Sequence, residues 1–105
     1  MTKKISILVV DDESSVRDSL YNWFIEDGFE VACAEDAKTA LQMLESDDFD
    51  IILSDIKMPG MDGLEMLKRI KNLKKDAIVI MMTAFATVET AVQALKEGAF
   101  DYVTK

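Results

Sequence analysis

At several places in the sequence, a short apolar run ends in a side chain that could take part in chemistry. In chain order these side chains are Asp11 and Asp12, Asp55, Thr83 and Lys105. Carboxylates held a few ångströms apart repel one another by about 4 kcal/mol per pair at an effective dielectric constant of about 20, and this repulsion favours binding of a cation. Because the sequence has no histidine, the ligands would be oxygens, which favour a hard divalent ion such as Mg²⁺. A hydroxyl and a lysine ammonium beside such a site are groups that a transferring phosphoryl group needs.

Asp55 is the residue that the predicted strands and helices would hold in position. The run Ile51-Ile52-Leu53 before it is apolar on both faces of a strand, which is typical of the centre of a parallel sheet. Asp55 would then lie at the carboxyl end of a strand, where open α/β sheets bind their ligands. A carboxylate that is ionised at neutral pH can act as a nucleophile without a general base. The alternative is that Asp55 only begins the next turn, as Asp often does.

The elements that must position these side chains alternate along the chain. We expect strands near residues 5–10, 29–34, 51–53, 77–82 and 100–103, and amphipathic helices that begin near Ser14, Asp36, Gly63 and Thr87. Such alternation with short loops requires parallel strands, right-handed crossovers and helices on both faces of the sheet, which is a doubly wound α/β fold. Because the alternation stops on a strand, we expect one sheet face to lack a helix and the chain to be cut from a longer protein.

The helical patterns also predict caps and core-facing side chains. The expected N-caps are Ser14 or Ser15, Asp36 and Thr87. The apolar positions expected to face the core are Met66, Leu67, Ile70 and Leu73 in the third helix and Val88, Ala91, Val92 and Leu95 in the fourth.

Length and composition limit the classes of protein to consider. A chain of 105 residues is one domain, and its 20 acidic against 12 basic residues give a net charge of −8. Such a surface repels nucleic acid and anionic membranes. We find no apolar run of 18 residues and no secretory leader, so we expect a cytoplasmic protein. The single cysteine, Cys33, excludes an internal disulfide and a metal site made of paired cysteines.

Four stretches of the sequence, VVDDE, SDIKMPGMDG, MTA and GAFDYVTK, resemble the signature stretches of the receiver domain of two-component response regulators. The resemblance covers the whole chain and implies a flavodoxin-like five-stranded sheet of order 2-1-3-4-5. It further implies a phosphoacceptor switch domain, which catalyses only its own phosphorylation and dephosphorylation and is not a general enzyme.

The same resemblance assigns a role to each matching residue. Asp55 would accept the phosphoryl group, and Mg²⁺ would be bound by Asp11, Asp12, Asp55 and the backbone carbonyl of Lys57. Thr83 would contact the phosphoryl group, Lys105 would pair with it, and Tyr102 would be an aromatic switch whose ring turns inward on activation.

The implied partners are a histidine kinase as donor and, as reader, an effector domain C-terminal to Lys105 or a separate target, with a homodimer as a further option. The stretch FATVETAVQALKEGAFDYV is similar to receivers of ATPase-type transcription activators. In the family a fifth helix follows the position of Lys105, so residues 1–105 would be a receiver domain truncated before its last helix.

Three alternatives were weighed against this interpretation. A dehalogenase-type phosphohydrolase would need an acid two residues after Asp55, where the sequence has Lys57. A flavin-binding domain would need a phosphate loop rich in Ser, Thr or Gly after the first strand, where the sequence has Asp11-Asp12-Glu13. A receiver-like interaction module that no longer depends on phosphorylation stays open, although Asp12, Asp55 and Thr83 argue against it.

Overall fold

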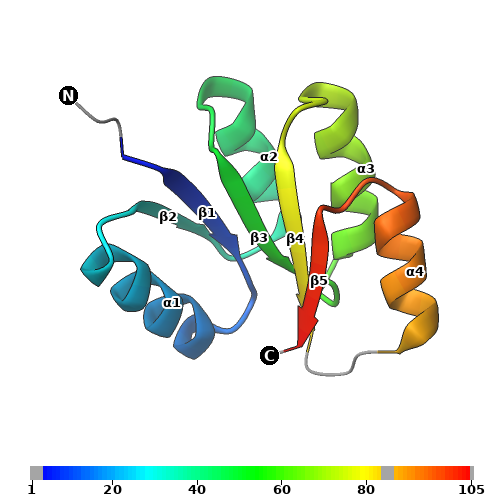
Figure 1. The fold of residues 1–105 in the computed structure, drawn as a ribbon, viewed down its shortest axis with the longest axis horizontal. Coiled ribbons are helices and arrows are strands. Elements are labelled where there is room, and N and C mark those ends of the chain that lie inside the picture. The colour runs from blue at the N-terminus through cyan, green and yellow to red at the C-terminus, as the bar shows by residue number, and fades with distance from the viewer. Residues whose placement is uncertain (1–3, 84–86, 105) are drawn as a thin grey trace.

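Each predicted apolar run forms a strand of one parallel sheet in the computed structural model, which describes residues 4–83 and 87–104 (Figure 1). The strands are β1 (Ser6–Val10), β2 (Glu30–Ala34), β3 (Ile51–Asp55), β4 (Ile78–Thr83) and β5 (Asp101–Thr104), and the helices are α1 (Ser14–Glu26), α2 (Ala37–Ser46), α3 (Gly63–Leu73) and α4 (Val88–Lys96). The strand order β2-β1-β3-β4-β5 confirms the predicted fold class. In the described part of the chain, no helix has the length and apolarity that crossing a membrane requires.

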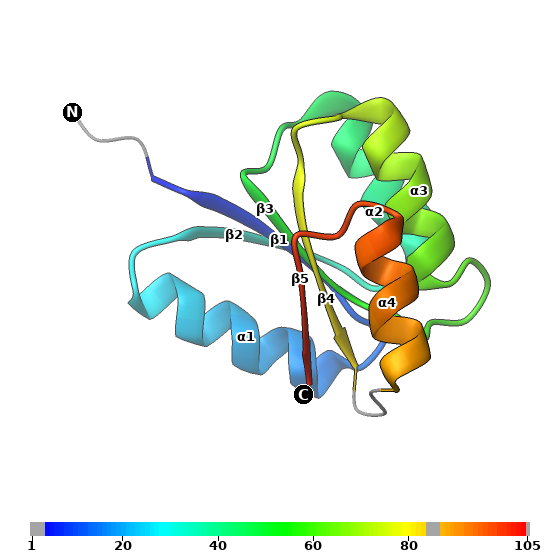
Figure 2. The same ribbon diagram turned by 45° about the vertical axis from the view of Figure 1, so that its right-hand side comes forward.

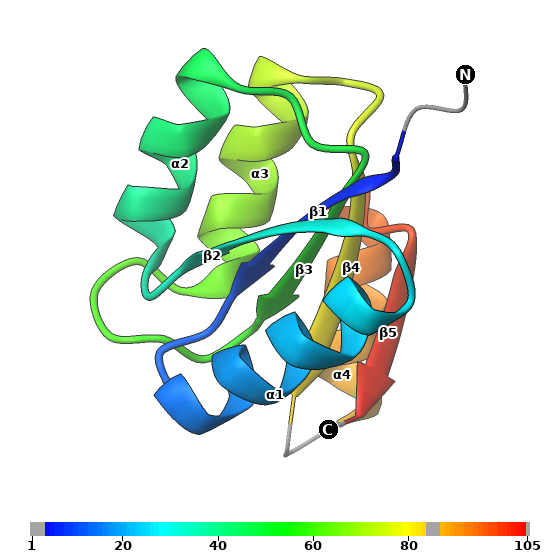
Figure 3. The ribbon, with the colours of Figure 1, turned by 90° about the vertical axis from the view of Figure 1, so that its left-hand side faces the viewer.

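The strands run in one direction, so their carboxyl ends share one edge of the sheet. Figure 3 shows the arrowheads of β1, β3 and β5 directed toward this edge. Leu8, Ile52 and Val79, on the three central strands, are completely buried. The edge strand β2 buries only its last residue, Ala34. This gradient of burial agrees with the position of β2 at an edge of the sheet.

The two faces of the sheet are covered unequally. Figure 2 shows α2, α3 and α4 side by side over one face, with α1 alone over the other. The helix α3 buries Met66, Leu67 and Ile70 completely, whereas no residue of α1 is buried. The indole of Trp23 in α1 is 64% exposed. The apolar side chains of α1, which an amphipathic helix normally buries, are therefore left partly accessible to solvent.

Two of the predicted helix caps are confirmed and one is wrong. The Asp36 carboxylate accepts a hydrogen bond of 2.7 Å from the backbone N–H of Thr39. The hydroxyl of Thr87 caps α4. At α1, however, neither Ser14 nor Ser15 is the cap, because the helix already begins at Ser14 and the N-cap is Glu13, whose side chain makes no capping hydrogen bond.

The predicted inward stripe of α4 is wrong for all its residues except Ala91, which is half-buried, and the predicted inward position of Leu73 is also wrong. Val88, Val92 and Leu95 are 80%, 43% and 51% exposed, and Leu73 is 52% exposed at the end of α3. The buried residue of α4 is Ala94. The small alanine side chain lets the helix pack closely on the sheet, and the larger apolar side chains are left facing solvent.

Candidate functional site at the carboxyl edge of the sheet

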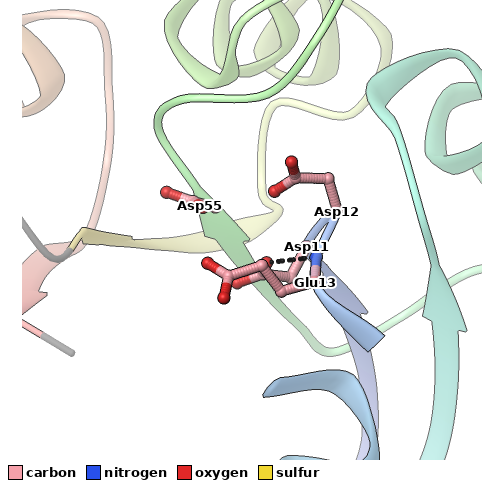
Figure 4. A group of neighbouring side chains, drawn as sticks. All are labelled: Asp11, Asp12, Glu13 and Asp55. Atoms are coloured by element: carbon pink, nitrogen blue, oxygen red, sulfur yellow. Dashed lines mark hydrogen bonds between the residues drawn. The ribbon is translucent and has the colours of Figure 1, made fainter. Parts of the chain in front are cut away.

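Four carboxylates gather where β1 and β3 end. Asp11, Asp12, Glu13 and Asp55 each place one carboxylate oxygen so that all four atoms lie within 4.8 Å of one another. Figure 4 shows that three of these acids come from the loop after β1, whereas Asp55 comes from the end of β3. The two strands are paired, so their ends are neighbours. The structure thus brings together the predicted Asp11, Asp12 and Asp55, and adds Glu13, to which the sequence analysis gave no role.

The four acids differ in their access to water. Asp11 is completely buried and Asp55 is 5% exposed, while Asp12 and Glu13 lie on the surface. Like charges this close repel one another, more strongly where water is excluded. Two buried and two exposed carboxylates supply oxygen donors and leave room for water ligands, which is the environment that Mg²⁺ prefers. The donor set therefore fits a hard divalent cation.

Backbone hydrogen bonds hold Asp11 in place. Its carboxylate oxygen Oδ1 accepts a hydrogen bond of 2.9 Å from the backbone N–H of Glu13, and its own N–H donates one of 3.1 Å to the carbonyl of Ala34. The guanidinium of Arg17 donates a hydrogen bond of 2.7 Å to the carbonyl oxygen of Asp11. The sequence analysis missed Arg17, although it is the only basic residue of α1 and lies in the turn next to the acids.

The backbone after β3 fixes Asp55. The N–H of Ile56 donates to the carbonyl of Met82, which extends the pairing of β3 and β4 past Asp55. The N–H of Lys57 donates a hydrogen bond of 3.2 Å to Oδ1 of Asp55, while the Lys57 side chain is exposed. The backbone of Lys57 is therefore beside the phosphoacceptor candidate, and the metal-binding role of its carbonyl stays a prediction.

Gly63, which has no side chain, lets the start of α3 pack closely against Asp55. The N–H of Gly63 donates a hydrogen bond of 2.6 Å to the carbonyl of Ile56. A Cβ atom at this position would lie 2.3 Å from the carbonyl oxygen of Asp55 and 2.8 Å from the Cα of Ile56. Both contacts are with backbone, so no side chain fits there without a shift of the strand end or the helix. From the sequence, this glycine was expected only to mark the place near which a helix begins.

The remaining predicted residues lie on β4 and β5. Thr83 is the last residue of β4, immediately after Met82, the partner of Asp55 in the sheet, and it is 3% exposed. Tyr102 is half-buried on β5, and its hydroxyl lies 2.9 Å from Oγ1 of Thr90 in α4. Lys105 lies outside the described residues, so the structure does not place its ammonium group relative to the acids.

Comparison with known proteins identifies relatives along the whole chain. The family model of the response regulator receiver domain matches residues 7–105. The regulatory protein AtoC of Escherichia coli (strain K12) is 49% identical over 105 residues, which are 100% of this chain and 23% of AtoC. The transcriptional regulatory protein FixJ of Bradyrhizobium diazoefficiens is 40% identical over 105 residues, which are 100% of this chain and 51% of FixJ. The chain thus spans about a quarter to a half of these curated relatives.

Solved structures share the fold. A CheY-like receiver domain protein from Methanospirillum hungatei has a TM-score of 0.94 at 35% identity, covering 98% of this chain and 82% of that chain. The response regulator TrrA from Thermotoga maritima, solved in complex with Mg²⁺-BeF, has a TM-score of 0.88 at 38% identity, covering 96% of this chain and 86% of that chain.

Proposed function

This chain belongs to the response regulator receiver domain family, and on that premise we propose that it is a phosphoacceptor switch that takes a phosphoryl group from a histidine kinase onto Asp55. The observation that carries the proposal is the cluster of Asp11, Asp12, Glu13 and Asp55 at the carboxyl edge of the sheet. The domain is regulatory, and the chemistry we assign to it is limited to its own phosphorylation and dephosphorylation.

The proposed transfer uses the Asp55 carboxylate as the nucleophile. One of its oxygens bonds to phosphorus while the bond from phosphorus to the donor's histidine nitrogen breaks, and the leaving imidazole keeps the electron pair. Thr83 would donate a hydrogen bond to a phosphoryl oxygen, and the Lys105 ammonium would pair with another. Thr83 is well placed for this role because it ends the strand next to Asp55.

Mg²⁺ is the cofactor we propose for this site. Asp11, Asp12 and Asp55 would hold it together with the backbone carbonyl of Lys57, and the proximity of Glu13 suggests a contact through water. When bound, the ion would neutralise the charge of the carboxylates and of the transferring phosphoryl group. The presence of Mg²⁺-BeF in the TrrA complex supports this assignment by similarity.

The same proposal extends to the output of the domain. Tyr102 would be the aromatic switch that responds when Thr83 contacts the phosphoryl group. The chain spans 23% of AtoC and 51% of FixJ, which supports an effector domain that follows residue 105 and acts in transcription. A separate target or a homodimer is the alternative reader, and the cytoplasm is the proposed compartment.

The sheet face that α1 alone covers supports the proposal of a further helix after residue 105. An apolar groove of about 530 Å³ lies between α1 and the strands β3, β4 and β5. It is lined by Ser15, Val16, Ser19, Leu20, Trp23, Leu53, Met82, Val103 and Thr104. We propose that this helix fills the groove, because α1 carries an apolar stripe and yet buries none of its residues.

The test is phosphorylation by a small phosphodonor, acetyl phosphate, followed by mass spectrometry of the intact protein. We expect one added phosphoryl group in the presence of Mg²⁺ and none in Asp55→Asn, which is nearly isosteric. Asp18→Asn, which removes an exposed acid of α1 outside the cluster, should be labelled like the parent protein. Undiminished labelling of Asp55→Asn, or full labelling in excess chelator, would contradict the proposal and favour the interaction module.

A further inference from the structure

The hydroxyl of Tyr102 lies 2.9 Å from Oγ1 of Thr90, and this contact joins β5 to the first turn of α4. Tyr102 pairs with Met81 in the sheet, two residues before the pair of Thr83 and Thr104. Side chains two residues apart on a strand point to the same face. Tyr102 is thus held on the face of the sheet to which Thr83 also points.

The Thr90 hydroxyl has further partners in the helix cap besides the Tyr102 phenol. Its Oγ1 lies 3.1 Å from the carbonyl oxygen of Thr87 and 2.9 Å from the Oγ1 of Thr87. In the contact with Tyr102 either hydroxyl can be the donor, since each has one proton and two lone pairs. The partner of the Tyr102 phenol is thus a hydroxyl that the helix cap already fixes.

Thr90 is fixed because it belongs to the capping box of α4. Its backbone N–H donates a hydrogen bond of 3.1 Å to Oγ1 of Thr87, and its Oγ1 accepts one of 3.3 Å from the backbone N–H of Thr87. The Thr90 side chain cannot rotate without breaking its hydrogen bond to the backbone of Thr87, which is one half of the capping box. The tip of the Tyr102 ring is therefore tied to the first turn of α4, whose N-cap Thr87 lies four residues after Thr83.

We infer that Thr90 is a positioning residue, which holds Tyr102 in its orientation and couples the ring to the start of α4. The inference rests on the proposed function in one respect, namely that Tyr102 is the switch. A reorientation of the ring must either break the bond to Thr90 or carry the first turn of α4 with it. Thr90 thereby contributes to the balance between the two orientations of the switch.

The orientation of Tyr102 can be measured independently of phosphorylation. The sequence has two tyrosines, so Tyr21→Phe leaves Tyr102 as the only one. We suggest incorporating 3-fluorotyrosine into this background and recording the ¹⁹F resonance of Tyr102. Thr90→Val, which keeps the shape but removes the hydroxyl, should move the resonance by more than its line width, and Thr90→Ser should leave it in place. Thr87→Val, which removes the cap but keeps the Thr90 hydroxyl, should move it less than half as far.

The effect on the switch can be read from the affinity for beryllofluoride with Mg²⁺. We expect Thr90→Val to change the apparent Kd by about threefold or more when Tyr102 is present, and by less than about 1.5-fold in the Tyr102→Phe background. Tyr102→Phe removes the same hydrogen bond from its other end, so it serves as a second variant if Thr90→Val does not fold.

The two measurements separate the positioning role of Thr90 from the proposed function. An unmoved Tyr102 resonance in Thr90→Val, or an equal movement in Thr87→Val, would overturn the positioning role. An equal change of Kd in both backgrounds would show that Thr90 does not act through Tyr102. If the parent protein does not bind beryllofluoride, the proposed function fails, and the ¹⁹F resonance still decides whether Thr90 positions the ring.

Discussion

Gly63 lies so close to Asp55 that a Cβ atom on the glycine would be 2.3 Å from the carbonyl oxygen of the aspartate. The first residue of α3 is therefore packed directly on the strand end that carries the proposed nucleophile. The second close contact, at 2.8 Å, is with the Cα of Ile56, and the third, at 2.9 Å, is with the Cε of Met81. The methionine side chain could move aside, but the two backbone atoms could not.

Gly63→Ala tests this packing. We expect the overpacked atom to cost about 1–3 kcal/mol of stability, which exceeds the roughly 1 kcal/mol that Ala usually gains over Gly in a helix. The rate of labelling by acetyl phosphate should also fall because Asp55 is displaced. Gly60→Ala is the matched control, since this loop glycine has a φ of +80° and nothing within 4 Å of an added Cβ. It should lower the melting temperature through backbone strain and leave labelling of the folded protein unchanged.

Asp12→Asn should raise stability in metal-free buffer. Asp12 is the exposed member of the cluster to which we assign a metal role, and its removal relieves repulsion from Asp11, Glu13 and Asp55. At the surface we expect a gain of about 1 kcal/mol, which corresponds to a melting temperature higher by roughly 4–8 °C. Addition of Mg²⁺ should raise the melting temperature of the parent protein and have a smaller effect on the variant. A metal-free melting temperature that falls would speak against charge crowding at this site.

Lys57→Ala should retain Mg²⁺ binding. The N–H of Lys57 contacts Asp55 and survives the substitution, while the exposed side chain provides no metal ligand in our assignment. Loss of an exposed positive charge near the site should tighten Mg²⁺ binding by no more than about twofold. Titration calorimetry measures the change. Mg²⁺ affinity that drops as far as in Asp12→Asn would mean that the side chain, and not the backbone, supports the ion.

The sequence was sufficient to predict that Asp11, Asp12 and Asp55 meet at the sheet edge, because parallel strands bring their carboxyl ends together wherever the apolar runs end. It was insufficient for contacts that depend on distances between elements. The close approach of Gly63 to Asp55 and the bond of Tyr102 to Thr90 both join segments whose separation only the folded chain defines. The stripe of α4 was misjudged for a related reason, since apolar periodicity does not show whether large or small residues face the sheet.

Asp36 gives a pH dependence whose sign can be derived. The hydrogen bond from the backbone N–H of Thr39 lowers the pKa of the Asp36 carboxyl below its ordinary value. A group whose pKa is lower in the folded state stabilises the fold above its unfolded value of about 3.9, and this contribution is lost as the pH falls through the folded value. Asp36→Asn should therefore be less stable than the parent protein near pH 6, and the difference should shrink below about pH 4. Urea unfolding at both pH values measures it, and a difference that is constant with pH would exclude the carboxylate as its source.

The groove beside α1, on the sheet face that α1 alone covers, should make the stability of the chain depend on the protein concentration. At about 25 cal/mol per Å², the exposed apolar lining of the groove corresponds to roughly 3–4 kcal/mol, which is a large part of the stability of a small domain. Trp23 and Val103 at the groove, 64% and 40% exposed, would contribute to that surface.

We expect the melting temperature of the 105-residue chain to rise with protein concentration, because a second copy covers the groove. The same protein extended through the segment that follows residue 105 should melt at a temperature independent of concentration. Trp23→Ser should weaken the concentration dependence, whereas Val88→Ser, which also replaces an exposed apolar side chain by serine but lies in α4 on the other side of the sheet, should leave it unchanged. Monomeric, cooperative unfolding of both proteins at matching temperatures would show that the groove tolerates water and that α1 alone covers its face well enough for the fold.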